Sequence, residues 1–385
     1  MTSLRAQIRI LWDGGVEAKT HAVRALASAA LKPQQAASIA EAGGIPPVVA
    51  LLRSGTVLQK EKAAELVALI GQHVVGAGAE AVDAGVLQPL VAMIRDGTTS
   101  EKNAASRAVT WLLENDKYKE QLVECLEISP LVALVREGTK LSKCCAAIAL
   151  SNLALDAEMN AKVAHGGAVP PLVAMLRDGD ATEKSNAAIA LRTLTQTVDT
   201  QRIVTEHGAI PLLVAILHEG RQGSEDKVNA ACALGNILAK SLGREATKVE
   251  EAGAIPPLLA MVRHGTAVEK AIAVHVLAKL CIIANRAGRL RTHVCKEIGK
   301  PGVIPSLVAS LHQIDADKQN KRDVMCLLWC LTSGDEDEAN RTESLRAGAI
   351  PALVTVMLDD TGDASEAAEL VLKNFCGLGH LVVWN

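Results

Sequence analysis

The sequence contains very few aromatic residues. Tyr and Phe occur once each and Trp four times, so aromatic side chains make up 2% of the 385 residues, whereas hydrophobic residues of all kinds make up 49%. A core of this composition is built from Ala, Leu, Val and Ile, whose small and aliphatic side chains permit close packing between helices. No segment alternates as a β-strand does. We therefore expect an all-α fold.

An excess of charge of one sign is also lacking. The formal net charge is −3 at pH 7, so the molecule has no overall basic field that would hold nucleic acid. No apolar run reaches the length of a membrane span, and residues 1–10 contain no signal-peptide core. We expect no nucleic-acid partner and no intrinsic membrane anchor.

Catalytic and metal-binding motifs are missing too. The Gly-x-Gly triplets at 76–78 and 377–379 lack the strand-turn-helix context of a nucleotide-binding loop, and no nucleophile elbow appears. Nine cysteines, an odd number, fit a reducing compartment better than a disulfide framework. Cys326 and Cys330 lie one helical turn apart, but a structural zinc needs four convergent ligands. The sequence thus predicts a non-enzymatic protein with small buried thiols and no cofactor or metal, in the cytoplasm or, alternatively, the nucleus.

What the chain does have is an internal repeat. The phrase GGAVPPLVAMLRDG at 166–179 recurs as AGAIPPLLAMVRHG at 252–265, and a second phrase such as KSNAAIALRTL at 184–194 follows each copy. The residue before the apolar run of the first phrase recurs at steps of 42, 41, 41, 41, 45, 49 and 46 residues. Self-similarity at this period is typical of stacked two- or three-helix units, which bury their apolar faces only against their neighbours.

Each repeat is predicted to contain three helices. The first ends at an Ala-Gly pair such as Ala252 and Gly253, where glycine adopts the left-handed conformation. The second begins at Ile-Pro-Pro, because proline is tolerated at the first helical position, and it ends at Arg-Asp-Gly or a near equivalent. The third is the Ala/Leu-rich phrase. The repeats begin near residues 1, 34, 74, 116, 157, 199, 244, 285 and 338, and the first and last are incomplete.

The pattern A-G-A-I-P-P-L-V followed by K-x-N-A-A-x-A-L-x-N-L-A resembles the armadillo repeat over about residues 7–376. It is most similar to the regular repeats of vacuolar armadillo scaffolds and of plant U-box ubiquitin ligases. The resemblance implies a right-handed armadillo-repeat superhelix, an α-solenoid of about nine three-helix repeats that forms a single domain over 1–385. It also implies that the third helices line a concave groove, in which an extended partner peptide usually binds.

Equivalent positions of the third helices define the candidate groove. In the armadillo family an Asn at this register commonly hydrogen-bonds the backbone of a bound peptide, and Asn152, Asn236 and Asn374 match it, the first two near the middle of the chain. The candidate peptide-binding residues at and around this register are Arg107, Trp111, Asn152, Arg192, Thr193, Asn236, His275 and Lys279. Their cations, set against few acids, favour an extended neutral-to-acidic peptide. Nuclear-import receptors of the family carry Trp one turn earlier in most repeats, and its absence here disfavours an import adaptor.

Two columns of cations accompany the groove. Lysine begins the third helix in eight of nine repeats, among them Lys102, Lys143, Lys184, Lys227 and Lys270. An acid often precedes it, so the column is either a ladder of ion pairs between repeats or a basic rim that attracts an acidic partner, and the ladder is the simpler interpretation. A second column, which includes Arg53, Arg95 and His218, closes the second helix, where a cation stabilises the last carbonyls of that helix.

Irregular segments interrupt the repeat. Residues 285–300 lengthen one repeat, and insertions in a solenoid are expected to form loops. Residues 285–300 carry five Arg and Lys side chains, and residues 335–338 are all Asp or Glu. The two segments are therefore expected to attract one another. Because solenoids need polar end caps, the irregular ends indicate either end-to-end self-association or a chain that is part of a longer protein.

These observations favour a non-enzymatic scaffold or adaptor that binds a protein or peptide partner. The alternative is the substrate-recognition region of a ubiquitin-ligase assembly, with a catalytic U-box outside these residues. A HEAT-like lyase that uses the concave face is disfavoured, because no acid–base or nucleophile cluster converges in the sequence.

Overall fold

The computed structural model describes residues 4–114, 121, 128–221, 223–239, 243–287, 291–299, 302–311, 318–333, 338–359 and 363–375. Two compact units, Met1–Thr197 and Val198–Asn385, make up the chain. The assignment of a single domain to residues 1–385 stays a prediction. The predicted repeat start near 116, the acidic residues 335–337 and the C-terminal residues 376–385 lie outside the described residues.

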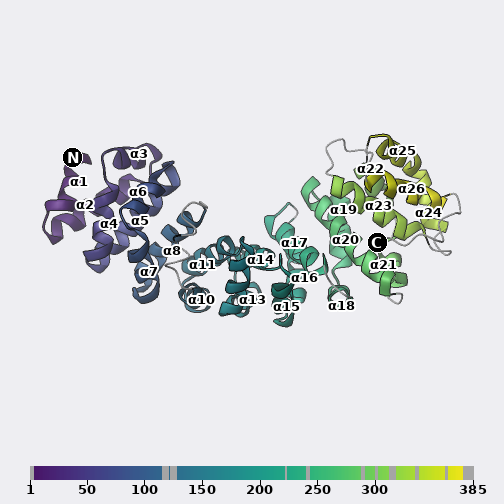
Figure 1. The fold of residues 1–385 in the computed structure, drawn as a ribbon, viewed down its shortest axis with the longest axis horizontal. Helices are drawn as coiled ribbons and strands as arrows, with labels where there is room; N and C mark the ends of the chain where they lie inside the picture. The colour runs from purple at the N-terminus through teal and green to yellow at the C-terminus, as the bar shows by residue number, and fades with distance from the viewer. Residues whose placement is uncertain are drawn as a thin grey trace. The chain divides into compact units, whose positions relative to one another are not determined.

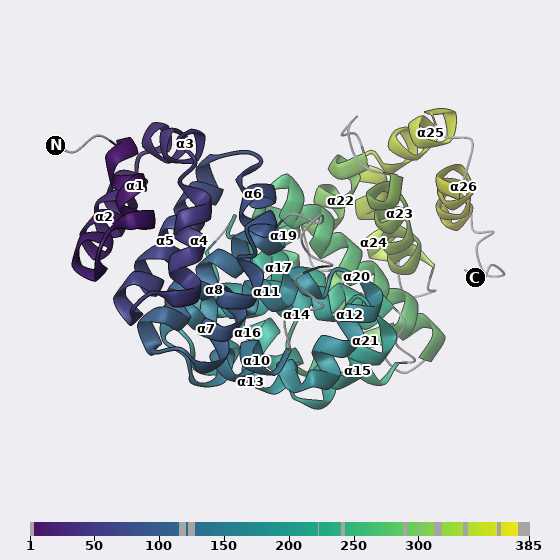
Figure 2. The ribbon, with the colours of Figure 1, turned by 60° about the vertical axis from the view of Figure 1, so that its left-hand side comes forward.

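The helices of the first compact unit follow one another in chain order (Figures 1 and 2). They are α1 (Leu4–Asp13), α2 (Val16–Ala29), α3 (Pro33–Glu41), α4 (Ile45–Ser54), α5 (Val57–His73), α6 (Ala77–Asp83), α7 (Leu87–Asp96), α8 (Thr99–Leu113), α10 (Ile128–Glu137), α11 (Lys140–Leu153), α12 (Ala157–Val163), α13 (Val169–Asp178) and α14 (Ala181–Leu194). A kinked turn, Ala164–Ala168, joins α12 to α13.

The second compact unit continues the same pattern. Its helices are α15 (Val198–Glu206), α16 (Ala209–Glu219), α17 (Glu225–Ala239), α18 (Arg244–Glu251), α19 (Ile255–His264), α20 (Ala267–Ala287), α21 (Arg291–Ile298), α22 (Val303–Leu311), α23 (Lys318–Thr332), α24 (Glu338–Arg346), α25 (Ala349–Asp359) and α26 (Asp363–Phe375). No strand occurs in the part of the chain that the structure describes.

The predicted helix boundaries are confirmed at the Ala-Gly and Pro-Pro positions. Gly43 and Gly253 have φ angles of 73° and 81°, a left-handed conformation that only glycine adopts without strain. Proline occupies the first turn of α4, α13 and α19, where no intrahelical donor is lost. The three-helix repeat read from the sequence is therefore the repeat of the structure wherever all three segments are described.

The core of each compact unit is a row of packed third helices. In the first unit α5 packs on α8, α8 on α11 and α11 on α14, and in the second α17, α20, α23 and α26 pack in the same succession. The contacts are close because alanine recurs at one register, and Ala105, Ala146 and Ala187 are all 0% exposed. Each third helix thus buries its small-residue face only against the next one.

Capping boxes begin several third helices. Thr98 Oγ1 accepts a hydrogen bond from Glu101 N, and Glu101 Oε2 accepts one from Thr98 N at 2.8 Å. The pair Asp180 and Glu183 repeats this arrangement on α14. Two backbone donors at each helix start are thereby satisfied reciprocally. The sequence analysis missed these caps, although Thr-x-x-Glu is their signature.

The cation that closes the second helix acts differently from the prediction. Arg53 Nη2 donates to Ala84 O at 2.7 Å and to Gly85 O at 3.3 Å, both at the end of the first helix of the next repeat. His218 Nε2 lies 3.3 Å from Gly253 O in the equivalent arrangement of the second unit. The expectation that these cations cap their own helix is therefore wrong for Arg53 and His218, which connect successive repeats.

The long repeat at 285–300 contains helix where loops were expected. α20 continues to Ala287 and α21 spans Arg291–Ile298. The additional residues therefore extend a third helix and supply the first helix of the next repeat. The predicted attraction to residues 335–338 is not assessed by the described residues.

Buried thiols meet in the second compact unit. Cys281 on α20 hydrogen-bonds the thiols of Cys295 and Cys330, on α21 and α23, and these contacts together with burial raise the pKa of Cys281 well above its usual 9.0. A hydrogen bond to Cys330 and burial raise the pKa of Cys326 as well. All four thiols are free and buried, so the prediction of buried cysteines is confirmed, while their convergence across three helices was not predicted.

A search of the described helices for membrane-spanning candidates finds none that is long and apolar enough by itself, and two sharply bent pairs, α3 with α4 and α6 with α7, meet the criterion only when both helices are counted together.

Removal of a cap oxygen tests the capping box of α8. In Thr98→Ala the acceptor for Glu101 N is lost, and we expect the free energy of unfolding to fall by about 1 kcal/mol, measured by urea denaturation followed by circular dichroism. Thr99→Ala, one position along and without a capping role, is the matched control and should change stability by less than about 0.5 kcal/mol. Equal losses in the two variants would contradict the cap.

The thiol cluster should be chemically inert while the chain is folded. Because the thiolate is the reactive form and the folded state raises the pKa of Cys281 and Cys326, these thiols should be alkylated at pH 8 only in denaturant, as measured by peptide mass spectrometry. The half-buried Cys232 is the internal control and should react first. The stability that comes from keeping these thiols protonated is complete below pH 9.0 and is lost above it. Rapid alkylation of Cys281 in the folded chain would refute this assignment.

Candidate peptide-binding groove

The candidate groove residues of the first compact unit lie on the third helices α8, α11 and α14. Trp111 lies half-buried on α8, with its indole against the backbone of α5. A Cβ atom at Gly71 would lie 2.1 Å from Trp111 Cε2. The indole can therefore pack against α5 only because residue 71 is a glycine. The sequence analysis selected Trp111 by register alone, and Gly71 supplies the physical reason for its placement.

Asn152 lies half-buried on α11, the third helix that packs on α8. Within the described part of the chain its amide makes no side-chain hydrogen bond. An asparagine amide carries both donors and an acceptor, so this side chain can pair with a peptide backbone. The Asn152 amide is therefore available to hydrogen-bond the backbone of a peptide, as the sequence analysis expected of this position.

Arg107 and Arg192 supply the positive charge of this surface. Both are half-buried, Arg107 on α8 and Arg192 on α14. Burial raises the pKa of Cys145 on α11, and the nearby Arg107 charge opposes that rise. The positive charge of Arg107 is therefore felt at the next third helix, which also carries Asn152.

Thr193 does not take part in the groove surface. Its side chain is 1% exposed, and Thr193 Oγ1 lies 2.9 Å from Ser151 Oγ on α11. Its carbonyl accepts a hydrogen bond from Asn160 Nδ2 at 2.8 Å. The prediction of a ligand-binding role for Thr193 is wrong in this respect, because the threonine sits between packed helices and its hydroxyl connects them.

The second compact unit places its candidates on α17 and α20. Asn236 lies half-buried on α17, and His275 and Lys279 lie half-buried one turn apart on α20. His275 Nδ1 is 2.7 Å from Asp323 Oδ2 on α23, and Gln319 Nε2 donates to the other carboxylate oxygen at 2.9 Å. The other edge of the imidazole faces Gly235 of α17.

The Asp323 carboxylate changes the expected electrostatics of this surface. We predicted that His275 and Lys279 act together as cations toward an acidic ligand. Instead, His275 is engaged by a carboxylate whose side chain is 7% exposed, and Lys279 carries the positive charge. Sequence reasoning missed Asp323 because it stands three residues before the aligned position Cys326, outside the positions that the register singled out.

Asn374 shows a second use of the same register. Its side chain is 5% exposed, and its Nδ2 donates to Trp329 O at 3.3 Å and to Thr332 Oγ1 at 3.1 Å. This asparagine binds the preceding third helix and is not available to a ligand. Two asparagines of one register therefore differ in this structure: the Asn374 amide binds the preceding third helix, and the Asn152 amide makes no side-chain hydrogen bond within the described residues.

The basic rim lies at the first turn of the third helices, where Lys102, Lys143, Lys184, Lys227 and Lys270 are all half-buried. Three of the acids that precede them act in caps: Glu101 Oε2 accepts from Thr98 N at 2.8 Å, Glu183 Oε2 from Asp180 N at 3.0 Å and Glu269 Oε2 from Thr266 N at 2.8 Å. Neither Lys102 nor Lys143 forms an ion pair with any described residue. The ion-pair ladder is therefore wrong for these two lysines, and attraction of an acidic partner stays a prediction.

The same surfaces offer no metal site within the described ranges. No group of three or more His, Cys, Asp or Glu side chains there is arranged to hold a metal ion. The groove residues of the first unit are an aromatic ring, an amide and two guanidinium groups, which provide hydrogen bonds and stacking. The arrangement suits recognition of a polypeptide.

No protein-family model matches the sequence, and no curated protein matches it either. Solved structures do match the fold. An engineered protein superposes with a TM-score of 0.77 at 22% identity, over 98% of this chain and 99% of that chain. Computationally designed armadillo repeat proteins for modular peptide recognition match with a TM-score of 0.56 at 26% identity, over 61% of this chain and 99% of that one.

A natural armadillo protein supports the same fold. A structure solved in a study of a phosphorylation switch in the interaction between cadherin and beta-catenin matches with a TM-score of 0.76 at 16% identity, over 97% of this chain and 69% of that chain. The particular likeness to vacuolar scaffolds and U-box ligases stays a prediction. Stacked three-helix repeats with packed third helices and these structural matches show that the chain has the all-α solenoid fold of the armadillo-repeat proteins.

Proposed function

We propose that this chain is a non-enzymatic protein-interaction scaffold that binds an extended peptide along its third helices. One observation carries the proposal: Trp111 and the unpaired amide of Asn152 lie exposed in part on adjacent, packed helices of the first compact unit. A large aromatic ring supplies contact area, and a free amide supplies both halves of a backbone hydrogen-bond pair.

The charge of the groove supports a neutral-to-acidic peptide. Arg107 and Arg192 flank Asn152 in the first unit, and Lys279 is the cation left beside the His275–Asp323 pair in the second. A designed armadillo repeat protein with a comparable fold was solved in complex with the peptide (KR)4. The cations of the present groove would repel such a basic ligand, so the peptide class proposed here is the opposite one.

The alternative function uses the same surface. A substrate-recognition region of a ubiquitin ligase also binds a peptide in the groove, and differs only in delivering the bound protein for modification. A ubiquitin-transfer assay with the full-length protein separates the two. We place either function in the cytoplasm or the nucleus, in keeping with the free buried thiols.

Loss of the two anchors tests the groove. Peptides selected from a random display library on the full chain serve as probes. We expect Trp111→Ala with Asn152→Ala to weaken their binding more than tenfold, because removal of a desolvated anchor typically costs about 2 kcal/mol. Affinity is measured by fluorescence anisotropy, and circular dichroism should show unchanged helical content.

Matched variants outside the groove control for general effects. Trp12→Ala removes a tryptophan that is 53% exposed on α1, and Asn186→Ala removes a half-buried amide near the start of α14 that donates to Thr182 O. Both should bind the selected peptides normally. Unchanged affinity in the groove double variant would refute the proposed site.

Salt and charge test the peptide class. Exposed charge pairs are screened over about 10 Å at 0.1 M ionic strength, so raising the salt concentration should weaken acidic peptides and leave uncharged ones nearly unaffected. Arg107→Gln should reduce the salt dependence for acidic peptides. Titration with (KR)4 provides the opposite case. Tight binding of (KR)4, or a selection dominated by basic sequences, would contradict the neutral-to-acidic assignment.

A further inference from the structure

A surface pocket recurs at successive repeat junctions of the first compact unit. The junction of α5 with α7 contains a pocket of about 750 Å³, the junction of α8 with α10 one of about 610 Å³, and the junction of α11 with α13 one of about 240 Å³. Each combines the lysine at the start of a third helix with the outer side of the next second helix. The lysines are Lys60, Lys102 and Lys143.

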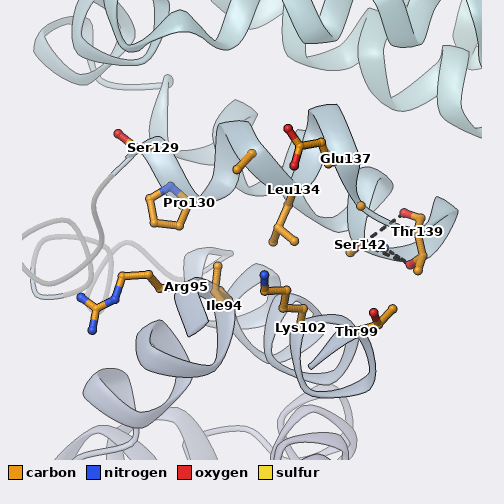
Figure 3. A pocket seen from close by; sticks show the side chains of 12 residues that line it. Ile94, Arg95, Thr99, Lys102, Ser129, Pro130, Leu134, Glu137, Thr139 and Ser142 are labelled. Atoms are coloured by element: carbon orange, nitrogen blue, oxygen red, sulfur yellow. Dashed lines mark hydrogen bonds between the residues drawn. The ribbon is translucent and has the colours of Figure 1, made fainter. Parts of the chain in front are cut away.

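The pocket floors are apolar and equivalent in sequence. In the pocket at Lys102 the floor is Pro130, Ala133 and Leu134, and Figure 3 shows Lys102 extending toward this helix while Glu137 lies on the same far wall. The pocket at Lys60 has Pro89, Ala92 and Met93 at the same places. The groove residues line none of the three pockets. This surface is therefore distinct from the candidate groove.

The charged groups around the two larger pockets are mostly engaged, and the lysines are the exception. Arg53 bonds the carbonyls of the next repeat. Arg95 Nε donates to Asp96 Oδ2 at 2.9 Å, and Glu137 Oε1 accepts from Arg136 Nε at 2.8 Å.

The last acid near these pockets, Glu101, is held in its capping box. Among the residues that the structure describes, Lys60 and Lys102 form no side-chain hydrogen bond or ion pair. Each of the two pockets therefore presents, above an apolar floor, one ammonium group that forms no ion pair with a described carboxylate.

The third pocket provides an internal comparison. Asp178 lines it beside Lys143 and forms no ion pair with a described residue, whereas Asp96 and Glu137, at the same place in the other two pockets, pair with arginines. The positive potential at Lys143 is therefore offset by an unpaired carboxylate. The pocket is also the smallest of the three. An anionic ligand should therefore depend less on Lys143 than on Lys60 and Lys102.

The spacing of the pockets limits the kind of ligand. The second helices α4, α7 and α10 pack on one another in succession, and packed helices lie about 8–10 Å apart. A polyproline II chain rises about 3.1 Å per residue with three residues per turn, so every third side chain lies on one face at intervals of about 9 Å. Its prolines also match floors of proline and aliphatic carbon.

We propose that Lys60 and Lys102, with the pockets beneath them, form a second binding surface, which takes an acidic segment of a partner protein in the polyproline II conformation, with Asp or Glu at every third residue. The ammonium groups pair with successive carboxylates, and the residues between them lie on the apolar floors. This surface and the groove can hold two different segments, because they share no residue.

A synthetic peptide of four Glu-Pro-Pro triplets is the probe, titrated into the full chain and followed by NMR or anisotropy. We expect Lys60→Gln with Lys102→Gln to weaken its binding by about tenfold, the sum of two partly exposed ion pairs. Lys143→Gln should have a smaller effect. The control is Lys32→Gln with Lys162→Gln, which removes the same charge from exposed positions of the same unit and should leave affinity unchanged.

Three further measurements decide the interpretation. A peptide of the same composition with its four glutamates consecutive should bind more weakly than the triplet peptide, and a Lys-Pro-Pro peptide should not bind. Trp111→Ala with Asn152→Ala should leave binding of the triplet peptide intact, which separates this proposal from the groove. The proposal is overturned if the triplet peptide does not bind, if the consecutive-charge peptide or a DNA duplex binds equally well, or if only the groove variant abolishes binding.

Discussion

Everything in this molecule depends on the packing of one third helix on the next. An isolated repeat has an apolar face with nothing to cover it, and alanines such as Ala105 and Ala146, both 0% exposed, allow neighbouring helices to approach closely enough to cover it. This packing also fixes the positions of all side chains that could contact a ligand. Trp111 is held because Gly71 leaves room for its ring, and Asn152 is presented because its helix is the next in the row.

The same stacking decides which charges remain available. Arg53 is used to join two repeats, and Glu101 and Glu183 are used to begin helices. The neighbouring acids and lysines at the start of the third helices therefore do not form ion pairs at Lys60 and Lys102. The carboxylates of Glu101 and Glu183 accept hydrogen bonds from backbone donors, and Lys60 and Lys102 form no ion pair with any described residue. A chain with a net charge of −3 can in this way present local positive sites.

The two candidate surfaces follow from different parts of the repeat. The candidate groove residues lie in the middle of the third helices, and they offer an amide, an indole and guanidinium groups. The pockets are made where a third helix begins beside the next second helix, and they offer ammonium groups above apolar floors. The two proposed surfaces of the first compact unit therefore differ in chemistry and share no residue.

The sequence by itself determined the repeat, its three helices and the register of the candidate residues. These features follow from local signals, because glycine in the left-handed conformation ends a helix and proline begins one. The regular period in turn indicates that equivalent helices stack on one another. The sequence analysis expected loops at 285–300 and missed both the extension of α20 to Ala287 and the helix at Arg291–Ile298. The repeat spacing shows that one repeat is longer, but it does not show whether the additional residues form helix or loop.

Only the tertiary structure decided what each registered side chain does. Asn152 and Asn374 occupy the same register, yet one amide is unpaired and the other is buried against Trp329 and Thr332. Thr193 was placed in the groove by alignment and lies between helices, and His275 was counted as a cation and faces Asp323. The physical reason is that a hydrogen-bond partner is set by the distance and rotation between two helices, and those depend on side chains some 40 residues away in the chain, which the period of the sequence does not encode.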